Sequence, residues 1–149
     1  MKLVVQRVLN AQVDVDGKTV GKINKGFMVL CGITHEDTEK EADVLARKLC
    51  NLRVFEDENE KMNLSLKDIG GELLVVSQFT LYGDCRKGRR PGFSDAARPE
   101  VAIPLYEEFI EKARNQDIKV GTGEFGAHMM VNIVNNGPTT ILLDSEKNF

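Results

Sequence analysis

Residues 134–142 read Val-Asn-Asn-Gly-Pro-Thr-Thr-Ile-Leu, and they join two apolar runs that are rich in β-branched residues. Gly137 has no Cβ and can reach backbone angles closed to other residues, while Pro138 has a fixed φ and no N–H to donate to a sheet ladder. Because Asn-Gly is a common turn signal, the simplest interpretation is a tight hairpin turn between two strands. The alternative is a stiff protrusion that presents carbonyl oxygens, since an X–Pro bond adopts the cis form at a cost of only about 0.5–1 kcal/mol.

The rest of the chain also contains patterns typical of β-strands. Residues 3–15 begin with an apolar stretch and end in alternation, and Asp16-Gly17 predicts a hairpin that returns through residues 18–23. Residues 27–33 are apolar apart from Gly32, as in a strand buried on both faces. Further strands are expected at residues 53–55, 72–76, 120–125, 129–134 and 140–143.

Two helices are predicted from capping and periodicity. Thr38 and Glu41 have the spacing of a capping box, and Pro99 and Pro104 mark a second helix start, because proline is tolerated in a first turn. The apolar residues of the two helices recur at steps of three and four: Ala42, Leu45, Leu49 and Leu52, then Leu105, Phe109 and Ala113. Residues 1–149 are therefore expected to form one α+β domain. We expect seven or eight mostly hairpin-connected strands in an antiparallel or mixed, barrel-like sheet, with two main helices on one side.

Composition limits the classes of function. A chain of 149 residues with 42% hydrophobic and 29% charged residues is typical of one soluble domain. It contains no apolar run of about 18 residues, so we expect no membrane span. The three cysteines lack metal-like spacing, so they are interpreted as reduced thiols in a cytoplasmic protein. His35 and His128 lie in no ligand motif, so neither a metal nor another cofactor is expected. The net charge of −3 means that any contact with nucleic acid must use a local patch.

The best candidate for a site is Ser77-Gln78-Phe79-Thr80, where an apolar strand becomes polar at its C-terminal end. The chain has no G-x-S-x-G elbow, P-loop, Rossmann glycine fingerprint or H-E-x-x-H motif. Ser77, Thr80 or Thr140 could act as a nucleophile only with a base within hydrogen-bond reach, and neither histidine stands out as that base. Side-chain chemistry alone therefore makes a weak case for an enzyme.

Two short motifs change this assessment: Ser77-Gln78-Phe79-Thr80-Leu81, and Asn135-x-Gly137-Pro138-x-Thr140. With these motifs at this separation, the chain resembles the D-aminoacyl-tRNA deacylase family over its whole length. The resemblance also includes residues 5–8, 61–64 and 90–94. One departure is Thr139, where the family usually has Val. Both residues are β-branched, so the local backbone is expected to survive, with an extra hydroxyl beside the site.

The resemblance implies a homodimeric hydrolase with its active sites at the subunit interface. It would cut the ester between a D-amino acid and the 3′-terminal ribose of tRNA, and would also accept achiral glycine. Gly137-Pro138 would be a cis dipeptide that enters the partner's active site and rejects L-amino acids, while Ser77, Gln78, Phe79 and Thr80 line that site. A backbone obstacle suits this task because the barrier to peptide isomerisation is about 18–20 kcal/mol.

Two mechanisms remain open. In the first, backbone N–H groups around Phe79 and Thr80 stabilise the oxyanion, and the 2′-hydroxyl of the tRNA helps to activate water. In the second, Ser77 or Thr140 is a covalent nucleophile. The missing base favours the first.

A cluster of cations follows the first motif, and it has two interpretations. It is either a solvated loop or a surface that meets tRNA phosphates. Its members are Arg86, Lys87, Arg89 and Arg90. Two other functions stay open: a non-catalytic RNA-binding or proofreading-accessory module that uses Phe79 and this loop, and a general esterase that uses Ser77. Met62, Phe125 and Met129 could line the site, but core packing is the favoured interpretation of each.

Overall fold

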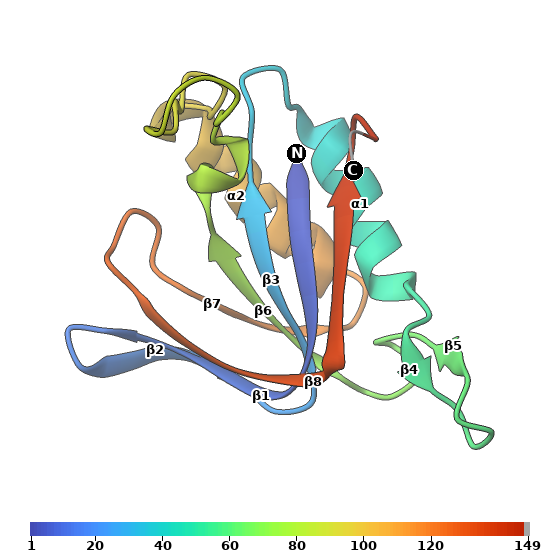
Figure 1. The fold of residues 1–149 in the computed structure, drawn as a ribbon. Coiled ribbons are helices and arrows are strands. Elements are labelled where there is room, and N and C mark those ends of the chain that lie inside the picture. The colour runs from blue at the N-terminus through green and yellow to red at the C-terminus, as the bar shows by residue number, and fades with distance from the viewer. Residues whose placement is uncertain (148–149) are drawn as a thin grey trace.

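A long bent ribbon of two antiparallel strands organises the computed structural model, which describes residues 1–147. β1 (Lys2–Val15) pairs with β8 (Met130–Asp144) along nearly its whole length. On its other edge, β1 pairs first with β3 (Gly26–Gly32) and then with β2 (Lys18–Ile23). Figure 1 shows that β1 and β8 bend together, so that the same two strands contribute to two walls of the molecule.

The centre of the sheet is parallel. β3 pairs with β6 (Glu72–Ser77), and β6 pairs with β7 (Lys119–Thr122), which makes the order β2-β1-β3-β6-β7. Parallel neighbours need crossover connections, and these contain α1 (Glu39–Asn51) and α2 (Pro99–Arg114). The predicted mixed sheet is confirmed, but the expectation of mostly hairpin connections is wrong for these central strands.

The sheet closes almost into a barrel, because β2 and β7 approach each other. A Cβ on Gly21 of β2 would lie 2.3 Å from the carbonyl oxygen of Thr122 in β7, so only glycine permits this approach. The remaining elements are the β4–β5 hairpin (Phe55–Glu56 and Met62–Leu64) and the 3-10 turn η1 (Phe79–Tyr82). The expected strand at residues 53–55 therefore begins later than predicted.

Two apolar clusters hold the sheet from its two faces. The larger one joins α1 and α2 to the sheet, and Figure 1 shows both helices on the same side, as predicted. It includes Leu3, Phe27, Leu49, Leu73, Val75 and Phe109. The smaller cluster fills the concave face with Val8, Ala11, Val13, Ile23, Met28, Leu74 and Val76.

Helix starts follow the sequence signals with one exception. The amide of Lys40 donates to the hydroxyl of Thr38 at 3.2 Å, and the Thr38 amide donates to the Glu41 carboxylate at 2.7 Å, which confirms the capping box. Pro99 occupies the first turn of α2, but Pro104 lies inside the helix. Pro104 removes only the hydrogen bond to the carbonyl of Glu100, and both residues face solvent, so water can satisfy that carbonyl.

Residues 134–142 do not form a hairpin turn. Both flanking runs belong to β8, and the pairing with β1 passes from Gln6–Thr140 to Val8–Asn135. β8 therefore carries extra residues at this point, and they leave the ladder as an exposed bulge, where a proline without an N–H is tolerated. The Gly137–Pro138 bond in this bulge is cis. Within residues 1–147, no helix is both long and apolar enough to span a membrane.

Candidate active site

A pocket of about 280 Å³ opens at the carboxyl ends of β3 and β6. Its walls come from the ends of these strands, from the start of η1, from the entry to α2 and from the loop between β7 and β8. The residues that line it include Ile33, Ser77, Gln78, Phe79, Ala102 and Phe125. Three of the four motif residues expected at the site thus meet at one cavity, whereas Thr80 does not line it.

The pairing of β6 with β3 determines how this motif is presented. The ladder continues one residue past the end of β6, where the Gln78 amide donates to the carbonyl of Cys31 at 2.8 Å. The chain then tightens into η1, in which the Leu81 amide donates to the Gln78 carbonyl at 3.3 Å. The N–H groups of Phe79 and Thr80 open this turn, so neither has a partner inside it. Thr80 is exposed and its hydroxyl accepts a hydrogen bond from the Gln78 side chain.

The wall between β7 and β8 contains two residues for which a place in the site was the less favoured interpretation of the sequence. Phe125 and Met129 were expected in the core, but both line the pocket, and each is only partly buried against a core cluster. Gly123 lies against this wall, since a Cβ there would lie 2.6 Å from the sulfur of Met129. The signal in the sequence that could have indicated this wall was a pair of glycines close to an aromatic residue. Core packing is the wrong prediction for Met62, which is 53% exposed on β5.

Two further polar groups face the same pocket. His128 lines it together with Ser77, although no hydrogen bond joins the two in the described part of the chain. Cys31 lines it as well, but burial raises the pKa of its thiol to about 12. Cys31 is therefore protonated at neutral pH and is not a nucleophile.

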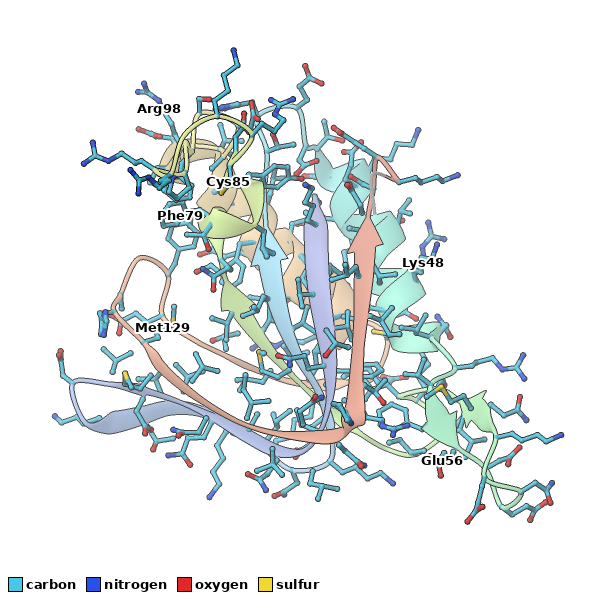
Figure 2. The ribbon with its side chains drawn as sticks, viewed as in Figure 1. Lys48, Glu56, Phe79, Cys85, Arg98 and Met129 are labelled. Atoms are coloured by element: carbon cyan, nitrogen blue, oxygen red, sulfur yellow. The ribbon has the colours of Figure 1, made fainter. Side chains whose placement is uncertain are left out.

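The Gly137–Pro138 bulge lies elsewhere in the same chain. Neither of its residues lines the pocket, and neither does Thr140. Figure 1 shows the bend of β8 beside the β4–β5 hairpin, at the opposite end of the sheet from η1. In Figure 2, Phe79 and Met129 lie on one side, and Glu56 beside the bend lies far from both. A single chain therefore does not bring the two motifs together.

Arg7 holds the bulge in place through a hydrogen bond from its buried side chain. The sequence did not indicate this contact. The Arg7 side chain is only 7% exposed. Its Nε donates to the carbonyl of Asn136 at 3.2 Å, and its Nη1 donates to the carbonyl of Val54 at 2.7 Å. The carboxylate of Glu56 lies 3.9 Å from its Nη2. One buried guanidinium thus ties β1 to the bulge and to the residue before β4.

The bulge is also closed from within β8. The Asn135 side chain donates to the carbonyls of Arg7 and Thr139, at 2.9 and 3.0 Å. Gly137 has a φ of 132°, and a Cβ there would lie 2.5 Å from the Thr139 hydroxyl oxygen, so only glycine fits. Thr139 itself is buried. The bulge therefore has one fixed backbone path that leaves Gly137 and Pro138 exposed.

The predicted cation cluster is the tip of a hairpin loop between η1 and α2. Asp84 and Gly92 close this loop through reciprocal backbone hydrogen bonds of 2.7 and 2.9 Å. Arg86 donates to both carboxylate oxygens of Asp84, which lowers the pKa of that carboxyl to about 2. Lys87, Arg89 and Arg90 are exposed and form no ion pair within residues 1–147.

Known proteins share both the sequence and the fold. A sequence model of the family described as D-Tyr-tRNA(Tyr) deacylase matches residues 4–144. A protein of Clostridioides difficile (strain 630), named D-aminoacyl-tRNA deacylase, is 66% identical over the full length of both chains. A protein of the same name from Thermosipho africanus (strain TCF52B) is 61% identical over the full length.

Two solved structures agree with these relatives. A protein described as c-Myc DNA Unwinding Element Binding Protein has a TM-score of 0.91 at 46% identity, over 97% of this chain and 99% of that chain. A probable eukaryotic D-amino acid tRNA deacylase has a TM-score of 0.81 at 19% identity, over 95% and 97% of the two chains, and demonstrates a shared fold. The chain therefore belongs to the D-Tyr-tRNA(Tyr) deacylase family of hydrolases and is an enzyme of that kind.

Proposed function

We propose that this enzyme hydrolyses the ester between a D-amino acid, or mischarged glycine, and the 3′-terminal ribose of tRNA. The observation that carries the proposal is the pocket at the end of β6, where Ser77, Gln78 and Phe79 of the family motif line one cavity. The work of such an enzyme is chiral proofreading in translation. A tRNA substrate and thiols without disulfides agree with a cytoplasmic location.

The chemistry we propose needs orientation more than a reactive side chain, since an ester is already activated. A water oxygen attacks the ester carbonyl carbon, the bond to the 3′ oxygen breaks, and that oxygen takes up a proton. The N–H groups of Phe79 and Thr80, which open η1 and lack a partner inside that turn, would bind the oxyanion. The 2′-hydroxyl of the tRNA would help to activate the water. The competing route uses Ser77 as a nucleophile, with His128 in the same pocket as a candidate base.

We infer that selection by chirality requires a second copy of the chain. The Gly137–Pro138 bulge is exposed and rigidly supported, yet it does not line the pocket of its own chain. β8 pairs only with β1 among the described strands, so its other edge is open, and it exposes Ile133, Val134 and Leu142. A long edge strand with exposed apolar residues is a ready surface for pairing between chains. In such a dimer, the bulge of one chain would reach the pocket of its partner.

Rejection of L-amino acids would then follow from a fixed obstacle. A side chain could rotate away from an L substituent, whereas the backbone of the bulge is held by Arg7 and Asn135. The carbonyl oxygens of the bulge would accept hydrogen bonds from the α-ammonium group of the substrate. Because the obstacle does not fit one particular side chain, many D-amino acids would be accepted.

The experiment that tests the function compares D-Tyr-tRNA and L-Tyr-tRNA as substrates of the purified protein and of Pro138→Ala. We expect the wild-type protein to hydrolyse only the D ester. The Pro138→Ala variant should hydrolyse the L ester measurably, because alanine lacks the fixed φ of proline. Binding of both substrates without hydrolysis would instead indicate a non-catalytic RNA-binding module. Hydrolysis of small esters that is lost in Ser77→Ala would indicate a general esterase.

A further inference from the structure

Two phenylalanines are exposed side by side next to the pocket. Phe79 in η1 is 57% exposed and Phe93 is 38% exposed. Their rings meet edge to face, with centroids 5.1 Å apart and planes at 72°. Burying a phenylalanine side chain stabilises a fold, so the exposure of both rings forgoes stabilisation. A surface that keeps an apolar pair in water commonly serves a ligand.

The backbone holds Phe93 in this position. The reciprocal hydrogen bonds of Asp84 and Gly92 close the cationic loop just before it, and the Ala96 amide donates to the Phe93 carbonyl at 3.1 Å. Its ring lies against Gly83, where a Cβ would come within 3.2 Å of the ring edge. Gly83 therefore provides the space that lets the Phe93 ring lie beside that of Phe79.

The surroundings of the pair indicate the chemistry of its ligand. Phe79 also lines the pocket, so the pair stands directly at that cavity. The unpaired cations Arg89 and Arg90 come just before Phe93 in the chain, on the loop that Asp84 and Gly92 close. Aromatic faces beside exposed cations are the usual combination for single-stranded nucleic acid, because bases stack on the rings and phosphates meet the cations.

We propose that the Phe79–Phe93 pair is a stacking platform for the nucleobase that precedes the terminal nucleotide of the tRNA. The inference rests on the proposed function, in which the pocket holds the terminal aminoacyl ester. The chain of the substrate must then leave the pocket past Phe79, and the next base meets the exposed rings. Stacking tolerates any base, so the platform would serve every tRNA without reading its sequence.

The test uses two short D-Tyr-ester substrates that end in the same terminal adenosine. One has cytidine before it, and the other has an abasic nucleotide at that position. Stacking on an aromatic ring is worth about 1–3 kcal/mol per base, so we expect the wild-type protein to prefer the intact substrate about tenfold or more in kcat/KM. In Phe93→Ala this preference should fall to nearly one.

Phe93→Leu and Val44→Ala are the matched controls. Leucine keeps the apolar bulk without an aromatic face, so it should lose the preference as alanine does. Val44 is 44% exposed on α1, away from the pocket, and its variant should keep the wild-type preference. Because the readout is a ratio of two substrates, a partly unfolded variant does not imitate the result.

Each outcome has a definite meaning. A wild-type protein that hydrolyses neither substrate contradicts the proposed function itself. A wild-type protein that hydrolyses both equally, or a Phe93→Ala variant that keeps the full preference, overturns the platform alone. If Phe93→Ala keeps the preference and dissociates the protein into monomers, the pair is a contact between two copies of the chain.

Discussion

At the scale of single residues, the pocket combines one motif with groups that lie far away in the sequence. Ser77 and His128 line the same cavity, and the N–H groups of Phe79 and Thr80 have no partner inside the turn η1. The two mechanisms therefore predict different effects of removing a hydroxyl.

Ser77→Ala separates these mechanisms. If main-chain N–H groups and the substrate's own hydroxyl are responsible for catalysis, kcat should fall by less than about tenfold, since no reacting group is lost. A fall of about a thousandfold or more, with trapping of an acyl-enzyme in the wild-type protein, would establish Ser77 as the nucleophile. Thr19→Ala is the control, because Thr19 is an exposed hydroxyl residue on β2 that does not line the pocket. Single-turnover hydrolysis of D-Tyr-tRNA measures both.

Arg7→Met should loosen the bulge without emptying the space under it. The substitution leaves the carbonyls of Asn136 and Val54 without a donor, and each unsatisfied group costs about 1–3 kcal/mol. We expect a lower free energy of unfolding in urea and a smaller D-to-L ratio of kcat/KM. Arg53→Met is the control, since Arg53 is exposed and donates to the carbonyl of Asn63 on β5, away from the bulge. If the D-to-L ratio does not change in Arg7→Met, the contacts of Arg7 with the bulge are not needed for the selection of D substrates.

At the scale of elements, the cationic hairpin and α1 offer two independent tests. Substitutions at the tip of the hairpin should change only the binding of tRNA, because the tip is exposed and backbone hydrogen bonds close the hairpin. Substitutions at the start of α1 should change only the stability of the fold, because this end of the helix lies away from the pocket.

Arg89→Ala combined with Arg90→Ala should flatten the salt dependence of KM. Each phosphate contact contributes about 0.7 to the slope of log K against log salt for a single strand and about 0.9 for a duplex. Loss of two contacts should therefore reduce the slope by about 1.4–1.8. Lys40→Ala with Lys48→Ala on α1 is the control with the same charge change. Equal slopes in the wild-type protein and the hairpin variant would remove the hairpin from the tRNA interface.

Thr38→Ala should destabilise the protein by about 0.5–2 kcal/mol, since α1 loses its N-cap. The loss should depend on pH. Hydrogen bonds from Thr38 hold the pKa of the Glu41 carboxyl below its usual range. Glu41 therefore stabilises the fold above its unfolded pKa near 4.5, and this stabilisation is lost as the pH falls through the lower folded value. Urea unfolding at pH 7 and pH 3 should show a smaller difference between Thr38→Ala and wild type at pH 3.

At the scale of the whole molecule, the structure separates the two sequence motifs that indicated the family. The first lines the pocket, and the second forms a bulge at the other end of the sheet. Association of two chains through β8 is the arrangement that we propose to reunite them.

A mixing experiment tests this arrangement. Ser77→Trp fills the pocket but keeps an intact bulge, whereas Pro138→Ala keeps the pocket and alters the bulge. We expect an excess of the Ser77→Trp chain to restore the rejection of L-Tyr-tRNA by the Pro138→Ala chain, after subunit exchange. A Ser77→Trp chain that also carries Leu142→Lys on β8 should not restore it, because a charge replaces an exposed apolar residue of the proposed interface. No restoration by either chain would mean that each site is complete within one copy.

The sequence by itself determined the local features of this protein. Capping residues, alternation and the Asp16-Gly17 turn are short-range signals, so both helices and the first hairpin were predicted near their observed bounds. The two motifs were sufficient to indicate the family. Such features depend on a few neighbouring residues, which is why they can be recognised in one dimension.

Tertiary structure decided what depends on distant pairing. Asn-Gly-Pro predicted a turn, but the pairing of both flanks with β1 made it a bulge inside one strand, because a continuous ladder satisfies more backbone groups than a local turn. The burial of Arg7 beneath the bulge and the fold-back of Phe125 and Met129 over the pocket also depend on contacts between distant residues. The separation of the two motifs has the same cause, since strand order is set by the packing of the whole sheet rather than by any one segment.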